Sequence, residues 1–214
     1  MENKTYETIL GRRSIRSFQP RQVEEGALEA VLQAGLYAPC GHGSQLVTLV
    51  AVQDPAVRAR LSAMNAAILG TDNDPYYGAP TIVVVLSSPE RPTWVEDGSC
   101  ALTVMMEAAH ALGLGSCWIH RARQMFDSPE GKALLQAWGV PEDMRGVGAL
   151  SLGYPAGAEA GPGLPGLTHM TKRKAPVFHR RKQGLMEMCI LSRHAKDSVM
   201  AEVQSSAHER ALIY

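Results

Sequence analysis

The stretch "EDGSCALTVMMEAAHALGLGSCWIH", residues 96–120, decides the fold because it joins a helical pattern directly to a strand pattern. Asp97 is predicted to cap the helix, and Gly113 and Gly115 are predicted to end it. "SCWIH" then returns to strand character. We therefore expect a central core helix over 98–112, followed at once by a strand. Its apolar stripe is formed by Ala101, Leu102, Met105, Ala108, Ala109 and Leu112.

Apolar, β-branched runs of strand length lie on both sides of this stretch. The predicted strands are "LVTLVAVQ" (46–53), "TIVVVLSS" (81–88) and "GVGALSLGYP" (146–155), and we expect the first two to be buried on both faces. Helices are predicted over 22–37, from Pro55 to about Leu69, and from Pro129 to Trp138. By itself this alternation predicts an α/β layered domain with parallel crossover units, although it does not fix the pairing direction.

Composition predicts one compact domain with a small partner. The chain has 214 residues, of which 45% are hydrophobic, and its 21 basic and 21 acidic residues cancel. That balance gives no bulk attraction to nucleic acid or to a membrane. No apolar segment suggests export or a membrane span, and neither the cysteine spacing nor His42 and His120 suggest a metal site. We expect a cytoplasmic, metal-free protein that binds a small molecule.

Basic residues gather in "RRSIRSF" (12–18). If the segment is helical, Arg12 and Arg16 share one side of a turn and Ser14 adds a hydroxyl nearby, an arrangement that suits phosphate. The alternative is a solvated turn whose surface ion pairs are each worth under about 1 kcal/mol. Its candidate partners are Glu2, Glu7, Glu24 and Glu25.

A second candidate is the loop "APCGHGSQ" (38–45), which follows the first long helix. Gly41 and Gly43 allow a ligand to approach the backbone closely. The same two glycines are typical of an ordinary helix stop. The local sequence alone favours that helix stop over a ligand-binding loop.

The order of these motifs adds information. "RRSIRSF", "APCGHGSQ", "GAPTIVVV", the 96–120 stretch, "GVGALSLGYPA" and a basic "KRKAP" follow one another as in the nitroreductase family of flavin-dependent oxidoreductases, which the chain resembles over about residues 5–182. The resemblance implies an α+β fold with a mixed, mostly antiparallel sheet, and it replaces the parallel-sheet expectation. It also implies an intertwined homodimer with FMN in each cleft between subunits. Residues 1–182 would form the FMN-binding domain, and 183–214 a tail that wraps the partner or is dispensable.

The resemblance also assigns roles to individual residues. Arg12 and Arg13 would hold the FMN phosphate, Ser14 the ring or ribitol, and Arg16 the pyrimidine edge. A cation at that edge stabilises the reduced ring more than the oxidised one. The remaining assignments are a second phosphate pair, Lys172 and Lys174; a loop reaching over from the partner subunit, Pro39, Cys40, Gly41 and Gln45; and a backbone that donates to the hydride-carrying nitrogen, Ile119, His120 and Arg121.

The implied activity is ping-pong hydride transfer from NADH or NADPH to an electron-poor acceptor such as a nitroaromatic or a quinone. No side chain is expected to do the chemistry, which resides in FMN. The rivals are another flavin reaction on the same fold (oxidase, flavin-consuming or dehalogenating) and a flavin-binding module without turnover. Family members commonly carry asparagine at Gly43, proline and an aromatic at Leu46 and Val47, and serine at Cys40, which we expect to be a packing residue.

Overall fold

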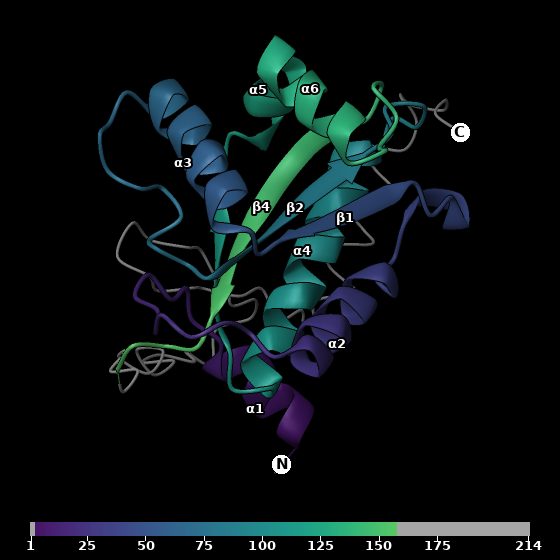
Figure 1. The fold of residues 1–214 in the computed structure, drawn as a ribbon. Helices are drawn as coiled ribbons and strands as arrows, with labels where there is room; N and C mark the ends of the chain where they lie inside the picture. Colours follow the sequence, from purple (N-terminus) through teal and green to yellow (C-terminus); the bar gives the residue numbers. More distant parts are fainter. Residues whose placement is uncertain (1–2, 158–214) are drawn as a thin grey trace, which may run out of the picture. The chain divides into compact units, whose positions relative to one another are not determined.

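The computed structural model describes residues 3–157 and arranges their strands in a single sheet (Figure 1). The four strands are β1 (Val47–Val52), β2 (Thr81–Ser87), β3 (Gly115–Ile119) and β4 (Arg145–Gly153), in the order β1-β2-β4-β3. Every neighbouring pair in this sheet is antiparallel. The α+β fold with a mostly antiparallel sheet is confirmed, and the parallel pairing suggested by alternation is wrong.

The connection between β1 and β2 explains the antiparallel pairing. It begins with α3 (Pro55–Leu69), whose 15 residues span about 22 Å. A plain crossover helix of this kind would deliver the chain to the start of a parallel strand. Here residues 70–80 follow the helix and can extend about 36 Å. They return the chain to the end of the sheet at which it left β1, so β2 runs back beside it.

Helices cover both faces of the sheet. The other helices are α1 (Lys4–Gly11), α2 (Glu25–Leu36), α4 (Trp94–Ala111), α5 (Ala122–Asp127) and α6 (Pro129–Ala137), with a short 3-10 turn η1 (Gly41–Gly43). The core residues of α2 and α4 pack with Val83 and Val85 of β2, whereas those of α3, α5 and α6 pack with Ile82, Val84 and Leu86. Successive residues of β2 therefore face different helical layers, as pleating requires.

The two strands that were expected to be buried on both faces, β1 and β2, differ in their burial. All of β2 is buried, as the unbroken apolar run predicts. Only Val52 of β1 is fully buried, so the expectation for this strand was wrong. Within the described residues β1 pairs only with β2, which makes it an edge strand.

The central helix begins earlier than the sequence suggests. α4 starts at Trp94, so Asp97 lies inside the first turn and is not the cap. Asp97 is buried because its carboxylate binds the backbone of the 38–45 loop. Two short helices, α1 and α5, are absent from the sequence prediction, whereas α3 has the predicted bounds.

The described helices include none that is long and apolar enough to cross a membrane. Several predictions fall outside the described residues. They are the second phosphate pair, Lys172 and Lys174, the domain boundary at residue 182 and the tail 183–214.

Candidate functional site

The basic segment 12–18 is extended and not helical. α1 ends at Gly11, and Arg12 has φ −56° and ψ 134°. Ser14 then forms a parallel bridge with Ser116 of β3, and the Ile15 N–H donates to the Ser116 carbonyl at 2.9 Å. Extended residues alternate sides, so Arg12, Ser14 and Arg16 still share a side, for a different reason from the predicted helical turn.

Contacts around Cys117 agree with this common side. Burial raises the pKa of the Cys117 thiol, while Arg16, Ser14 and Arg12 act on it in the opposite direction. The segment can lie this close to β3 because Gly115 has no side chain. A Cβ at Gly115 would lie 2.8 Å from the Ile15 Cγ2 atom. The sheet therefore anchors the arginine segment through its backbone.

Arg12 makes an ion pair that the sequence did not suggest. Its Nε lies 3.4 Å from Oε1 of Glu107 on α4, and both side chains are about one quarter exposed, at 27% and 26%. The Arg12 Nη1 and Glu107 Oε2 atoms are buried without a hydrogen-bond partner among the described residues. A buried guanidinium nitrogen without an acceptor is costly. Among residues 3–157, Arg12 therefore has one guanidinium donor that no protein acceptor uses.

The other two arginines have different surroundings. Arg13 Nη1 donates to the carbonyls of Leu10 and Arg12, each at 2.7 Å, and so binds the last turn of α1. Arg16 is exposed, and its guanidinium carbon lies 5.9 Å from the centre of the Tyr77 ring. That distance is within the range of a cation–π contact. Arg12 and Arg16 can thus meet a ligand, whereas one Arg13 nitrogen is already engaged.

The 38–45 loop is held by α4. The Gly41 N–H donates to Asp97 Oδ1 at 2.8 Å, and the Thr93 hydroxyl donates to Asp97 Oδ2 at 3.3 Å. A Cβ at Gly41 would lie 2.4 Å from Thr93 Oγ1, so the close approach requires glycine. The loop bends through left-handed residues, which are His42, Gly43 and Gln45 with φ of 54°, 65° and 50°.

Three of the four predicted loop residues share a cavity. Pro39, Cys40 and Gln45 line a space of ≈ 550 Å³ with Val47 of β1, and neither the arginine segment nor the residues after β3 line it. The volume is within the range of small-ligand sites. The Cys40 sulfur accepts the Gln45 N–H at 3.4 Å, which links these two residues of the loop. In this chain the cavity beside the loop is therefore not lined by the arginine segment.

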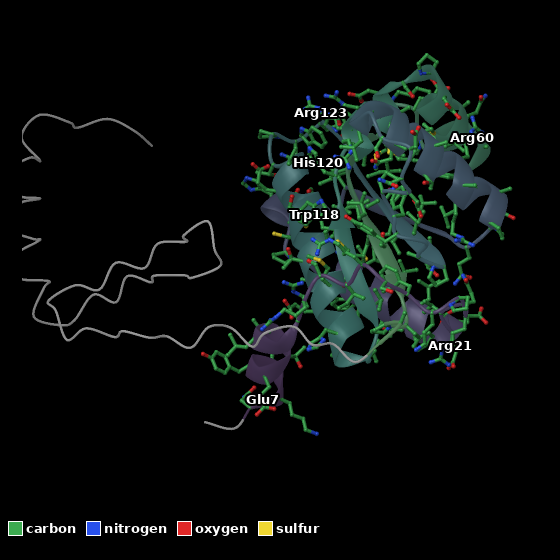
Figure 2. All side chains as sticks on the ribbon, turned by 90° about the vertical axis from the view of Figure 1, so that its left-hand side faces the viewer. Glu7, Arg21, Arg60, Trp118, His120 and Arg123 are labelled. Atoms are coloured by element: carbon green, nitrogen blue, oxygen red, sulfur yellow. The ribbon has the colours of Figure 1, made fainter. Side chains whose placement is uncertain are left out.

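The third predicted group is the turn after β3. Ile119 is buried and His120 is exposed, whereas Arg121 is half-buried with φ 79° and ψ 2°. Figure 2 shows Trp118, His120 and Arg123 along one side of the molecule, so this turn opens to solvent. The Arg121 guanidinium instead reaches Asn65 of α3, a buried residue that no sequence motif marked.

The fold resembles that of solved nitroreductases. The crystal structure of a nitroreductase with bound FMN from Bacteroides fragilis has 31% identity to this chain and a TM-score of 0.69, covering 80% of this chain and all of the other. A protein of Archaeoglobus fulgidus described as a candidate NADH dehydrogenase/NAD(P)H nitroreductase is 33% identical over 69% of this chain and 83% of its own length. A similarly described protein of Methanothermobacter thermautotrophicus is 29% identical over 70% and 76%.

A family model described as "Nitroreductase family" matches residues 9–73 and 68–154. The chain belongs to the nitroreductase family, and the sequence-based resemblance is confirmed. It is therefore a member of an oxidoreductase family.

Proposed function

We propose that this protein is a cytoplasmic, FMN-dependent oxidoreductase that uses NADH or NADPH to reduce electron-poor small molecules such as nitroaromatics or quinones. The observation that carries the proposal is the Arg12 Nη1 donor, which is buried and has no acceptor among residues 3–157. It lies on the same side of an extended segment as Ser14 and Arg16. Support also comes from relatives whose names include NAD(P)H nitroreductase and from a similar structure solved with FMN.

The donor set suits an FMN phosphate and ring. Arg12 can supply a charge-assisted hydrogen bond through Nη1 while Glu107 holds its Nε in place. Ser14 is exposed and offers a hydroxyl two residues further along the same side. Arg13 would contribute less than Arg12, because its Nη1 atom already has two carbonyl acceptors. The residues present therefore fit the cofactor, with Arg12 as the main phosphate ligand.

Bound FMN would supply the chemistry of ping-pong hydride transfer from a reduced nicotinamide to an electron-poor acceptor. The protein's part is to orient the two molecules and to tune charge. Arg16 would do the tuning, because a guanidinium beside the pyrimidine edge favours a negatively charged ring. The Tyr77 ring lies beside Arg16, with its centre 5.9 Å from the guanidinium carbon.

We further propose that the functional unit is a homodimer with FMN at the subunit interface. The cavity lined by Pro39, Cys40 and Gln45 contains none of the arginine segment, so the loop of one subunit would complete the site of the other. α1 has no buried residue in the described structure. Its apolar side chains are exposed to solvent, at 60% for Tyr6, 52% for Ile9 and 40% for Leu10. Such a helix gains stability if a partner subunit covers its apolar side chains.

A panel of acceptors tests this function. The purified protein is incubated with FMN, desalted, and assayed anaerobically with NADH and with NADPH in the presence of nitroaromatics and quinones. We expect a yellow protein and acceptor-dependent nicotinamide oxidation. A protein that retains no FMN would overturn the proposal.

Two other results would indicate a different function. Retained FMN with nicotinamide oxidation only when oxygen is admitted would identify an oxidase. Retained FMN without any nicotinamide oxidation would identify a flavin-binding module that does not turn over. Both differ from the expected result in the same assay, so one preparation separates the three.

A further inference from the structure

The turn after β3 contains a strained residue. Arg121 adopts a left-handed backbone conformation, with φ 79° and ψ 2°, directly before α5. Residues other than glycine adopt this conformation at a cost, and it persists only where the surroundings hold it. Arg121 follows exposed His120, so the strain lies at the surface where the candidate site opens. Some contact must therefore hold this turn.

Asn65 supplies that contact from α3. Its side chain is completely buried. Asn65 Oδ1 accepts from Arg121 Nε at 2.8 Å, and Asn65 Nδ2 donates to the His120 carbonyl at 2.9 Å. Arginine only donates and a carbonyl only accepts, so these partners fix which end of the amide faces which residue. The two shortest hydrogen bonds of this fully buried amide are thus made to consecutive residues of one turn.

Further polar contacts surround the Asn65 amide. Its Nδ2 atom also lies 3.5 Å from the Tyr76 hydroxyl and 3.4 Å from the Met125 sulfur. Tyr76 is 2% exposed, and burial raises its pKa to about 12, so the hydroxyl keeps its proton near neutral pH. Asp74 accepts the Tyr76 backbone N–H at 2.9 Å and the Gly78 N–H at 2.7 Å. The amide therefore sits between α3, the turn at 74–78 and α5.

The same 74–78 turn connects this cluster to the arginine segment. Tyr76 faces inward onto Asn65, whereas the next residue, Tyr77, is 41% exposed and lies beside Arg16. The turn thus contacts Arg16 directly through Tyr77, and it is linked to Arg121 only through Asn65.

We propose that Asn65 is a positioning residue, which holds the His120–Arg121 backbone in the conformation that meets the flavin and keeps the Arg121 guanidinium turned inward. This inference rests on the proposed FMN function. It predicts that Asn65 affects the flavin without touching it. The backbone and the exposed His120 side chain would face the ligand, and Arg121 would serve through its main chain.

Three variants and a control test this role. Asn65→Leu removes both hydrogen bonds at similar size, and Asn65→Asp keeps the acceptor for Arg121 but loses the donor to His120. Asn65→Leu combined with Arg121→Gly restores the turn by another route, because glycine adopts the left-handed conformation at little cost. Asn73→Leu makes the same change at an exposed position and serves as the control.

The first readout needs no flavin. In FMN-free protein, amide hydrogen exchange at residues 120–122 is expected to be at least about tenfold faster in Asn65→Leu than in wild type, because two hydrogen bonds are lost and one of them comes from a charged guanidinium. Asn65→Asp is expected to change in the same direction by less, and it keeps the test available if Asn65→Leu does not fold. Asn73→Leu should match wild type.

The second readout is the midpoint potential of the bound flavin. We expect it to move toward that of free FMN in Asn65→Leu and to return toward the wild-type value when Arg121→Gly is added. An unchanged potential, or an Asn65→Leu shift that Arg121→Gly leaves in place, would overturn the positioning role. If wild-type protein retains no FMN, the proposed function is wrong. If it retains FMN and the Asn65 variants match wild type in both readouts, only the present inference is wrong.

Discussion

Arg12→Ala tests the predicted phosphate ligand most sharply. The substitution removes the Nη1 atom that is buried without an acceptor among the described residues. It also removes the Nε contact to Glu107 at 3.4 Å. If Nη1 binds the FMN phosphate, the variant loses a charge-assisted hydrogen bond to a doubly charged group. If Arg12 only pairs with Glu107, flavin binding should hardly change.

The expected size follows from that one bond. A hydrogen bond involving a charged group contributes about 1.5–3 kcal/mol. With tenfold in affinity for every 1.4 kcal/mol, the FMN dissociation constant should rise about ten- to a hundredfold. Riboflavin lacks the phosphate, so its binding should be unaffected. Arg13→Ala is the matched control and should cost less, because Arg13 Nη1 binds the carbonyls of Leu10 and Arg12.

Titration of the apoprotein, followed by flavin fluorescence, measures both ligands under the same conditions. Arg12→Ala leaves the Glu107 carboxylate without its cation, which could alter folding. The double variant Arg12→Ala/Glu107→Gln removes that charge and should bind FMN as weakly as the single variant. Equal losses for FMN and riboflavin, or a larger loss in Arg13→Ala, would refute the assignment of Arg12 to the phosphate.

Three further changes have distinct expected results. Arg16→Ala should slow flavin reduction by nicotinamide more than it weakens FMN binding, and equal effects in stopped-flow and titration would contradict a tuning role. Gly41→Ala should lower stability by about 1–3 kcal/mol in chemical denaturation, because its Cβ would meet Thr93 Oγ1 at 2.4 Å; adding Thr93→Ala should relieve most of this cost, and an unrelieved loss would count against the steric explanation. The bond from Arg145 lowers the pKa of the Asp127 carboxyl, so its stabilisation is present above the ordinary pKa of about 4 and is lost as the pH falls through the lower folded value. The melting temperature of Asp127→Asn should therefore differ from wild type near neutral pH and converge with it in acid, and a constant difference would exclude this linkage.

The sequence predicts those elements whose signals are local. α3 has its predicted bounds because Asp54 caps it and accepts the Val57 N–H, Pro55 starts it, and Gly70 ends it in a left-handed conformation. The buried strand β2 is predicted equally well, since an apolar run of that length is typical of a buried strand. In each case the residues that decide the structure lie within the element or beside it.

Features that depend on distant partners could not be predicted in this way. Asp97 has the sequence position of a helix cap, yet it binds Gly41, which is 56 residues away. The 12–16 segment has helical spacing, yet it is extended because it bonds to Ser116 of β3. Local periodicity contains no information about either contact, so both expectations failed for the same reason.

The residues of the candidate site show the same difference between local signals and contacts with distant residues. The sequence marked the arginine segment, the 38–45 loop and the turn after β3 through motif order, and the structure assigns each a defined setting. It did not mark Glu107, which interrupts an apolar helix face as an ordinary exposed acid could, or Asn65, a single polar residue in a helix. Only the tertiary structure shows that these two residues hold Arg12 and Arg121.

Anaerobic stopped-flow spectroscopy of the FMN-loaded protein tests the central proposal most directly. The absorbance of oxidised flavin is followed while NADH or NADPH is mixed in, and then while a nitroaromatic or a quinone is added to the reduced protein. We expect one of the nicotinamides to bleach the flavin within a catalytic turnover time and an acceptor to restore the absorbance. A bound flavin that neither nicotinamide bleaches would contradict the proposal that this protein is an NAD(P)H-dependent oxidoreductase.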